Sequence, residues 1–162
     1  AVQVYASSIY ASDKMRIVRG CTENIIEFLN QGMVPIISGD MVPDKTMGYS
    51  VLSGDQIIAD LVGKLRPKKI IYGSDVDGLF ENDPKVHPDS KFISQVSIDE
   101  IEDIANKLVS ADASGQMKGK LMEIKNLLQS GVKEVFLLNL KREGILSSVL
   151  KGEEIKFTRF YV

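Results

Sequence analysis

Hydrophobic residues along the chain fall into two alternating patterns, short continuous runs and longer segments with one apolar face. The short runs, bounded by Gly, Pro and polar residues, predict buried β-strands. Segments with apolar residues three and four positions apart predict amphipathic helices. Strands are expected at residues 1–9, 33–39, 68–74, 133–140 and 155–162. Helices are expected at residues 23–31, 55–66, 98–109, 121–129 and 142–150. Thr22 is expected to cap the first of these helices.

This alternation of strands and helices predicts an α/β protein. The expected architecture is a three-layer αβα sandwich with a mostly parallel sheet, because buried parallel strands need helices on both faces. Residues 12–20 are expected to form a connector or a short hairpin, residues 40–54 an excursion or hairpin, and residues 75–91 a long loop. Ligands of such sheets bind beyond the carboxyl ends of the strands. The segments that follow the strands are therefore the places to look for a site.

Composition and charge narrow the picture only slightly. A chain of 162 residues with 44% hydrophobic and 26% charged residues is typical of one globular domain, expected over residues 1–162. The net charge of −2 gives no indication of nucleic-acid or anionic-membrane binding. No apolar run is long enough to span a bilayer. Cys21 is the only cysteine, which excludes an internal disulfide and favours a reducing compartment, the cytoplasm.

The tripeptide Ser53-Gly54-Asp55 stands directly before an expected helix. As a structural feature, Ser53 or Asp55 would cap the helix N-terminus, where a carboxylate also complements the helix dipole. As a functional feature, Gly54 would let a ligand approach the backbone, and Asp55 would organise a lysine or a metal-bound phosphate. Taken alone, these residues favour the structural cap.

Three aspartates follow the strand expected at residues 68–74, in the sequence "GSDVDGLFENDP". They are Asp75, Asp77 and Asp83. Their spacing does not match a calcium-binding loop, since no later Glu completes the ligand set. As a structural feature, Asp77 and Gly78 would form an ordinary turn. As a functional feature, this turn would hold the ribose or base of a nucleotide at the end of the strand. The residues alone leave both interpretations open.

The third candidate motif is "ASGQMKGK", which places two glycines and two lysines near the start of a helix. The helix dipole opposes Lys118 and Lys120 at this position, and a shared anion such as a phosphate would relieve that repulsion. A Walker P-loop is excluded, because its GxxxxGK[ST] pattern is absent. The structural alternative is a solvated helix start. Carboxylates, lysines and glycine turns at one edge of a sheet together favour metal-assisted phosphoryl transfer.

In this order, the three motifs resemble those of the amino acid kinase superfamily, and within it those of isopentenyl phosphate kinases. "GMVPIISGDMVPDKTMGYSVLSGDQIIADL" is similar to the family's strand–GD–hairpin–SGDD–helix block. "IIYGSDVDGLFENDP" is similar to its nucleotide turn, and "ADASGQMKGKL" to its phosphate loop. The resemblance covers the whole chain. It implies an amino acid kinase-like fold, ATP and Mg²⁺ as cofactors, and phosphorylation of a small phosphate monoester, foremost isopentenyl phosphate in isoprenoid biosynthesis.

The resemblance also implies a role for each matching position. Asp55 and Lys120 are implied to be catalytic, Asp55 by organising the catalytic lysines and Lys120 by steadying the transferring phosphoryl group. Gly54 and Ser53 are implied to lie near the phosphate acceptor. No residue is implied as a direct metal ligand. The positions implied to bind ATP are Asp75, Asp77, Gly78, Gly115, Gln116 and Lys120.

The chain departs from the family pattern in three places. Gln116 stands where the family usually has glycine, and Gln56 where it usually has aspartate. The Gly-rich loops and the acceptor-binding histidine of the family's N-terminal part have no counterpart, so that part of the fold is expected to be missing. A homodimer, or pairing with a separate N-terminal part, is expected from the family's habit of dimerising.

Two further interpretations stay open at this point. A nucleotide-binding or regulatory module without catalysis would account for Gln116 and for the missing histidine. Another kinase of the superfamily, acting on uridylate, glutamate, aspartate or fosfomycin, would share the same three motifs.

Overall fold

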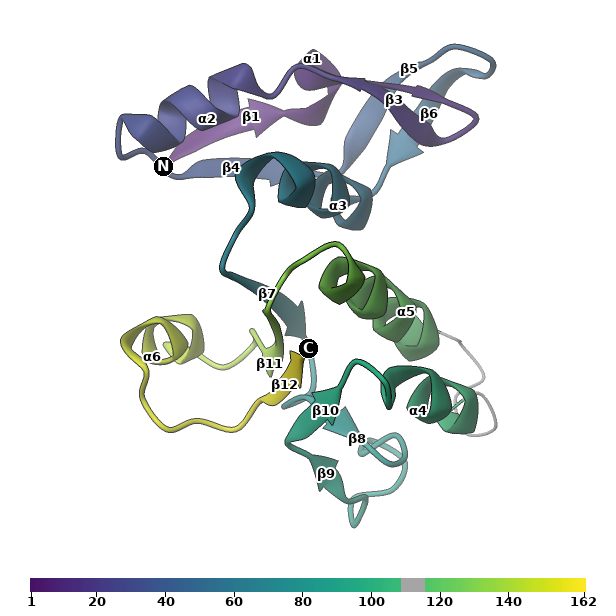
Figure 1. Ribbon diagram of the computed structural model, residues 1–162, viewed down its shortest axis with the longest axis vertical. Coiled ribbons are helices and arrows are strands. Elements are labelled where there is room, and N and C mark those ends of the chain that lie inside the picture. Colours follow the sequence, from purple (N-terminus) through teal and green to yellow (C-terminus); the bar gives the residue numbers. More distant parts are fainter. Residues whose placement is uncertain (109–115) are drawn as a thin grey trace. The chain divides into compact units, whose positions relative to one another are not determined.

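The computed structural model describes residues 1–108 and 116–162, and only the backbone of Gln116. The chain divides into two compact units, Ala1–Arg66 and Pro67–Val162, and each has its own sheets and its own core. The mixed α/β class with parallel core strands is confirmed (Figure 1). That both units form the single domain expected from the sequence stays a prediction. Within the described residues, no helix combines the length and the apolar character needed to cross a bilayer.

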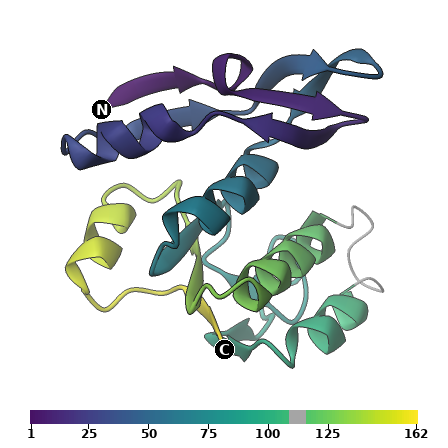
Figure 2. The ribbon, with the colours of Figure 1, turned by 45° about the horizontal axis from the view of Figure 1, so that its top comes forward.

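The first unit contains two sheets and three helices. Strand β1 pairs in parallel with β4, and the second sheet has the order β3-β2-β5-β6. Hairpins β2–β3 and β5–β6 (Figure 2) confirm the hairpins expected at residues 12–20 and 40–54. The elements are β1 (Val2–Tyr5), α1 (Ala6–Ile9), β2 (Tyr10–Asp13), β3 (Arg16–Gly20), α2 (Glu23–Asn30), β4 (Pro35–Ser38), β5 (Asp40–Asp44), β6 (Gly48–Leu52) and α3 (Gly54–Leu65).

Three expectations for the first unit are wrong. The strand expected at residues 1–9 ends at Tyr5, because the next four residues form one helical turn that buries Ala6. Thr22 makes no side-chain capping bond, since its φ of −101° and ψ of 6° differ from the extended backbone that such caps use. Strand β4 is only half buried: Ile37 packs against the core, whereas Ile36 is 57% exposed, because successive strand residues face opposite sides.

The carboxylate of Asp44 links the two hairpins of the first unit. Asp44 is only 4% exposed. Burial acts to raise the pKa of Asp44, but the hydrogen bonds that its carboxylate accepts outweigh burial and hold that pKa well below its usual value. The donors, at 2.9 to 3.2 Å, are the backbone N–H groups of Lys14, Met15, Thr46 and Met47 and the hydroxyl of Ser12.

Replacing Asp44 with asparagine is expected to lower stability most at neutral pH. A carboxyl whose folded pKa lies below its unfolded value of about 3.9 stabilises the fold above that value and loses its contribution as the pH falls through the folded pKa. The difference in urea midpoint between wild type and Asp44→Asn should therefore shrink as the pH falls from about 5 toward about 2. A difference that stays constant over this range would contradict the role given to Asp44.

The second unit is built on a four-stranded sheet in the order β10-β12-β11-β7. Strands β7 and β11 are parallel, as are β10 and β12, whereas β11 and β12 are antiparallel. Helices α4 and α5 lie on one side of this sheet and α6 on the other, which gives the expected three layers (Figures 1 and 2). The elements are β7 (Lys69–Ser74), β8 (Leu79–Phe80), β9 (Phe92–Ile93), β10 (Gln95–Ser97), α4 (Ile101–Leu108), α5 (Gln116–Gln129), β11 (Glu134–Asn139), α6 (Ile145–Lys151) and β12 (Thr158–Tyr161).

Strand β11 carries the core of the second unit. Phe136 and Leu138 pack against Ile145 and Val149 of α6. The alternate residues of β11 face the other side, because side chains alternate along a strand, and Leu137 is fully buried there.

In the second unit α4, α6 and β12 each begin three residues later than expected, and two further differences have a clear physical reason. The loop expected at residues 75–91 contains β8, which pairs antiparallel with β9; a two-residue strand is too short to show an alternating pattern. Helix α5 begins at Gln116 rather than at residue 121. Its apolar face runs back to Met117, four residues before the buried Leu121, so the helical spacing starts inside the glycine-lysine motif.

Candidate functional site

The carboxyl ends of β7 and β11 lie side by side in the second unit. The register pairs Ser74 at the end of β7 with Asn139 at the end of β11. The N–H of Leu140 donates to the carbonyl of Ser74 at 3.1 Å, which extends this pairing by one residue. The segment Asp75–Gly78, the aspartate turn, therefore leaves the sheet beside the segment that follows β11. Sheets of this kind bind ligands at this edge.

Asp75 opens the aspartate turn and carries two nearby cations. Its carboxylate forms an ion pair with Lys85, and the ammonium of Lys141 lies 3.9 Å from Asp75 Oδ2. The hydrogen bond from Lys85 holds the pKa of Asp75 below its usual value, and the same contact raises the pKa of Lys85. Both side chains are well exposed, so the pair adds little to stability and its charges are accessible to a ligand.

Asp77 is held more firmly than Asp75. Its Oδ1 accepts a hydrogen bond from Asn139 Nδ2 at 3.1 Å, and its Oδ2 accepts one from Arg142 Nη2 at 2.8 Å. Asn139 is the last residue of β11, and Arg142 lies three residues further along the chain. Asp77 therefore ties the aspartate turn to the neighbouring strand end.

Gly78 closes the aspartate turn in a conformation that favours glycine, with φ of +145°. A Cβ at this position would lie 2.5 Å from Thr158 Oγ1 and 2.9 Å from Thr158 N. The same Thr158 hydroxyl accepts the N–H of Leu79 at 2.7 Å and donates to the carbonyl of Ile93 at 2.6 Å. Glycine is needed at position 78 because the backbone of the aspartate turn passes too close to Thr158 to leave room for a side chain.

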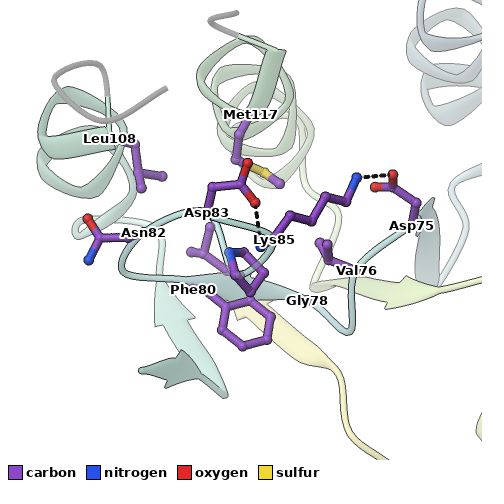
Figure 3. A pocket seen from close by; sticks show the side chains of 11 residues that line it. Asp75, Val76, Gly78, Phe80, Asn82, Asp83, Lys85, Leu108 and Met117 are labelled. Atoms are coloured by element: carbon purple, nitrogen blue, oxygen red, sulfur yellow. Dashed lines mark hydrogen bonds and ion pairs between the residues drawn. The ribbon is translucent and has the colours of Figure 1, made fainter. Parts of the chain in front are cut away.

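A pocket of about 170 Å³ lies beside the aspartate turn. Figure 3 shows Lys85 reaching across it toward Asp75, with Leu108 of α4 and Met117 of α5 on other sides. An apolar lining with a few charged groups is typical of a small-molecule site. The apolar residues that line it are Val76, Leu79, Phe80, Leu108 and Met117, and the charged ones are Asp75, Asp83 and Lys85.

Lys120 reaches β7 from helix α5. Its ammonium donates to the carbonyl of Gly73 at 3.2 Å and lies 5.8 Å from the centre of the Tyr72 ring. The structure therefore brings Lys120 next to the strand that leads into the aspartate turn. Gly115 lies outside the described residues, and Gln116 is described only as the first backbone position of α5.

The remaining predicted residues lie in the first unit, at the start of α3. Ser53 is the N-cap, and its Oγ accepts the N–H of Gln56 at 3.3 Å, so the structural interpretation of this residue is confirmed. Gly54 and Asp55 form the first turn of the helix. A Cβ on Gly39 would lie 2.8 Å from the carbonyl of Leu52 and 3.4 Å from Gly54 N. The end of β4 thus closely approaches the start of α3.

The predicted site residues thus fall into two sets, one in each unit. Ser53, Gly54 and Asp55 gather at the start of α3, whereas Lys120 and the aspartate turn gather at the sheet edge of the second unit. The functional roles expected for these residues stay predictions. Over residues 1–108 and 116–162, no three His, Cys, Asp or Glu side chains gather closely enough to hold a metal ion.

Sequence reasoning missed the residues that surround the aspartate turn. Lys85 lies ten positions after Asp75, and no sequence pattern predicted their contact. Asn139, Lys141 and Arg142 did carry a signal, since they follow the apolar run of β11 at the carboxyl end of a strand, where sites of this class are found.

Comparisons with known proteins show the family to which the chain belongs. The amino acid kinase family model matches residues 1–139. An isopentenyl phosphate kinase of Methanothermobacter thermautotrophicus is 35% identical over an aligned length of 162 positions, and the alignment covers 98% of this chain and 60% of that protein. A glutamate 5-kinase of Methanosarcina barkeri is 32% identical over 135 residues, covering 82% of this chain and 35% of that protein.

A solved structure gives the same result. A crystal structure of isopentenyl phosphate kinase superposes with a TM-score of 0.77 at 32% identity, and the match covers 98% of this chain and 58% of that one. The chain thus spans about three fifths of the length of these isopentenyl phosphate kinases. With its family model, its relatives and its fold in agreement, the chain belongs to the amino acid kinase family.

Proposed function

We propose that this chain supplies the Mg-ATP site of a kinase that phosphorylates a small phosphate monoester, with isopentenyl phosphate as the leading acceptor. The observation that carries the proposal is the pocket of about 170 Å³ between the aspartate turn, α4 and α5. Lys120 contacts β7, the strand that leads into this turn. The relative with 35% identity, named isopentenyl phosphate kinase, supports the choice of acceptor.

The pocket fits a nucleotide in its chemistry. Val76, Phe80 and Met117 offer an apolar surface for a base, while Asp75 and Lys85 offer groups for a ribose and for phosphates. The described residues contain no cluster of three metal-ligating side chains. Mg²⁺ would therefore be bound largely through the nucleotide phosphates and water, as it commonly is in kinases.

The proposed reaction needs charge stabilisation and positioning rather than a protein base. The bound nucleotide would supply the phosphoryl group. An oxygen of the monoester, which is already anionic, would attack the γ-phosphorus without losing a proton to the protein, while the bond from this phosphorus to the β,γ-bridging oxygen breaks and ADP leaves. The ammonium of Lys120 would stabilise the negative charge that develops on the group in transfer. Asp55 would organise the catalytic lysines, as the family resemblance implies. Ser53 and Gly54 would lie near the phosphate acceptor. A homodimer and a cytoplasmic location also remain proposals.

The nucleotide site is tested by calorimetric titration of the folded chain with Mg-ATP. Binding is expected for the wild type. Met117→Ala, which removes apolar surface from the pocket, is expected to weaken it about three- to fivefold, corresponding to about 1 kcal/mol of lost burial. Met122→Ala removes the same side chain from α5 outside the pocket and is expected to leave the affinity unchanged. A folded wild-type chain that releases no heat with Mg-ATP would contradict the proposal.

The acceptor is tested separately, by comparing phosphoryl transfer to isopentenyl phosphate, glutamate and uridylate. The glutamate 5-kinase relative makes glutamate the main competitor. Higher kcat/KM for isopentenyl phosphate than for the other two is expected, and a preference for glutamate would replace the proposed acceptor while leaving the Mg-ATP site intact.

A further inference from the structure

The two aspartates of the aspartate turn differ in their surroundings. The side chain of Asp75 is 43% exposed and faces exposed lysines, whereas that of Asp77 is only 16% exposed. Both carboxylate oxygens of Asp77 already accept a hydrogen bond, one from Asn139 and one from Arg142. These two contacts tie the backbone of Asp77 to the end of β11 and the segment that follows it.

We infer that Asn139 and Arg142 are positioning residues that hold Asp77 and thereby fix the aspartate turn for nucleotide binding. This inference rests on the proposed function, and it assigns to Asn139 and Arg142 a role that was not among the sequence predictions. Asn139 and Arg142 would act through Asp77, without touching the nucleotide.

The segment that presents Arg142 is itself well anchored. The N–H of Arg142 donates to the carbonyl of Asn139 at 3.2 Å, and the N–H of Lys141 donates to the side-chain oxygen of Asn139 at 3.1 Å. The N–H of Leu140 continues the ladder to β7. The backbone therefore turns sharply after β11, and this turn directs the guanidinium of Arg142 back to Asp77.

The aspartate turn is fixed at two points in consequence. Asp77 is bonded to the end of β11, and the N–H of Leu79 is bonded to the hydroxyl of Thr158 in β12. Gly78, with its φ of +145°, lies between them. Loss of the first point would loosen Asp75 and Val76, which line the pocket, and leave them held by the exposed Lys85 ion pair and by a 3.4 Å hydrogen bond from the Val76 N–H to Ser74 Oγ.

The exposure of Arg142 makes the inference testable without damage to the core. Its side chain is 55% exposed, so Arg142→Gln is expected to fold normally and to lose only the charged contact. Arg142→Lys keeps the charge and loses the planar fork, so an intermediate effect is expected. Lys151→Gln makes the same charge change on the exposed end of α6 and is the matched control.

The first measurement is hydrogen exchange of the backbone amides of residues 73–80 in the whole chain without nucleotide. Exchange in Arg142→Gln is expected to be up to about tenfold faster than in wild type, because the charged contact that holds Asp77 is lost. Lys151→Gln is expected to match wild type. Unchanged exchange in Arg142→Gln, or an equal increase in Lys151→Gln, would overturn the inference.

The second measurement is a double-mutant cycle on Mg-ATP affinity, using Arg142→Gln, Asp77→Asn and the double variant. Each single variant is expected to weaken binding about fivefold or more, and the double variant no more than either single one, because the two side chains act as one contact. Additive losses would overturn the inference. A failure of the proposed function is a separate result, since it would already appear as an absence of Mg-ATP binding by the unsubstituted chain.

Discussion

Replacing Lys120 with alanine is expected to lower the rate of phosphoryl transfer about 100- to 1,000-fold while weakening Mg-ATP binding less than about fivefold. The ammonium of Lys120 lies at β7, one residue before the end of that strand, on the carbonyl of Gly73. A fixed positive charge at this place would stabilise the transition state more than the bound nucleotide, because negative charge is redistributed as the phosphoryl group moves. Single-turnover rates and calorimetric Kd values, measured on the same preparations, separate the two effects.

Two further variants make the result for Lys120 specific. Lys120→Arg keeps the charge at a different geometry, and an intermediate rate is expected. Lys133→Ala removes an exposed lysine just after α5 and is expected to leave the rate unchanged. A Lys120→Ala protein that transfers phosphate at the wild-type rate, or whose whole loss lies in Mg-ATP affinity, would refute the catalytic role.

Replacing Gly78 with alanine is expected to destabilise the protein by about 3 kcal/mol, since a left-handed backbone costs a non-glycine residue about 1 to 3 kcal/mol and overpacking adds a similar amount. The added Cβ would lie 2.9 Å from the backbone nitrogen of Thr158, which cannot move aside as the end of a flexible side chain can. The change is measured as a shift of the urea midpoint, and Mg-ATP binding should be lost with it.

Gly119 provides the matched control for Gly78. It lies in α5, in the same unit, with open space where a Cβ would stand. Gly119→Ala is expected to raise stability by about 0.5 to 1 kcal/mol, because alanine has the higher helix propensity. A Gly78→Ala protein as stable as wild type would mean that the aspartate turn relaxes without cost.

The long elements of the fold could be predicted because each carries its own pattern. Strand β11 is a short run of four consecutive buried apolar residues, whereas helix α3 has its buried residues on one helical face, so local sequence suffices to find them. The short pair β8–β9 was missed because its stability comes from Phe80 meeting Phe92, twelve residues away. Helix α1 was missed for a similar reason, since one turn cannot show a helical period.

A site residue could be predicted only where its structural partners lie close to it in the sequence. Ser53 caps α3 as its place before the helix predicted. The partners of Asp77 could not be predicted, because Asn139 and Arg142 lie 62 and 65 residues further along the chain. Only the register of β7 against β11 brings them together, and that register is a property of the folded sheet.

The strand order of the second unit also bears on how the protein is made. Strand β12 is the last of the four strands along the chain, yet it lies between β10 and β11. As the chain leaves the ribosome, β7 and β11 can pair, but β10 has no neighbour until β12 has been synthesised. The Thr158 hydroxyl that anchors the aspartate turn arrives with β12. We therefore expect the turn to reach its final conformation only after β12 has been synthesised, when the other three strands of the sheet have already emerged.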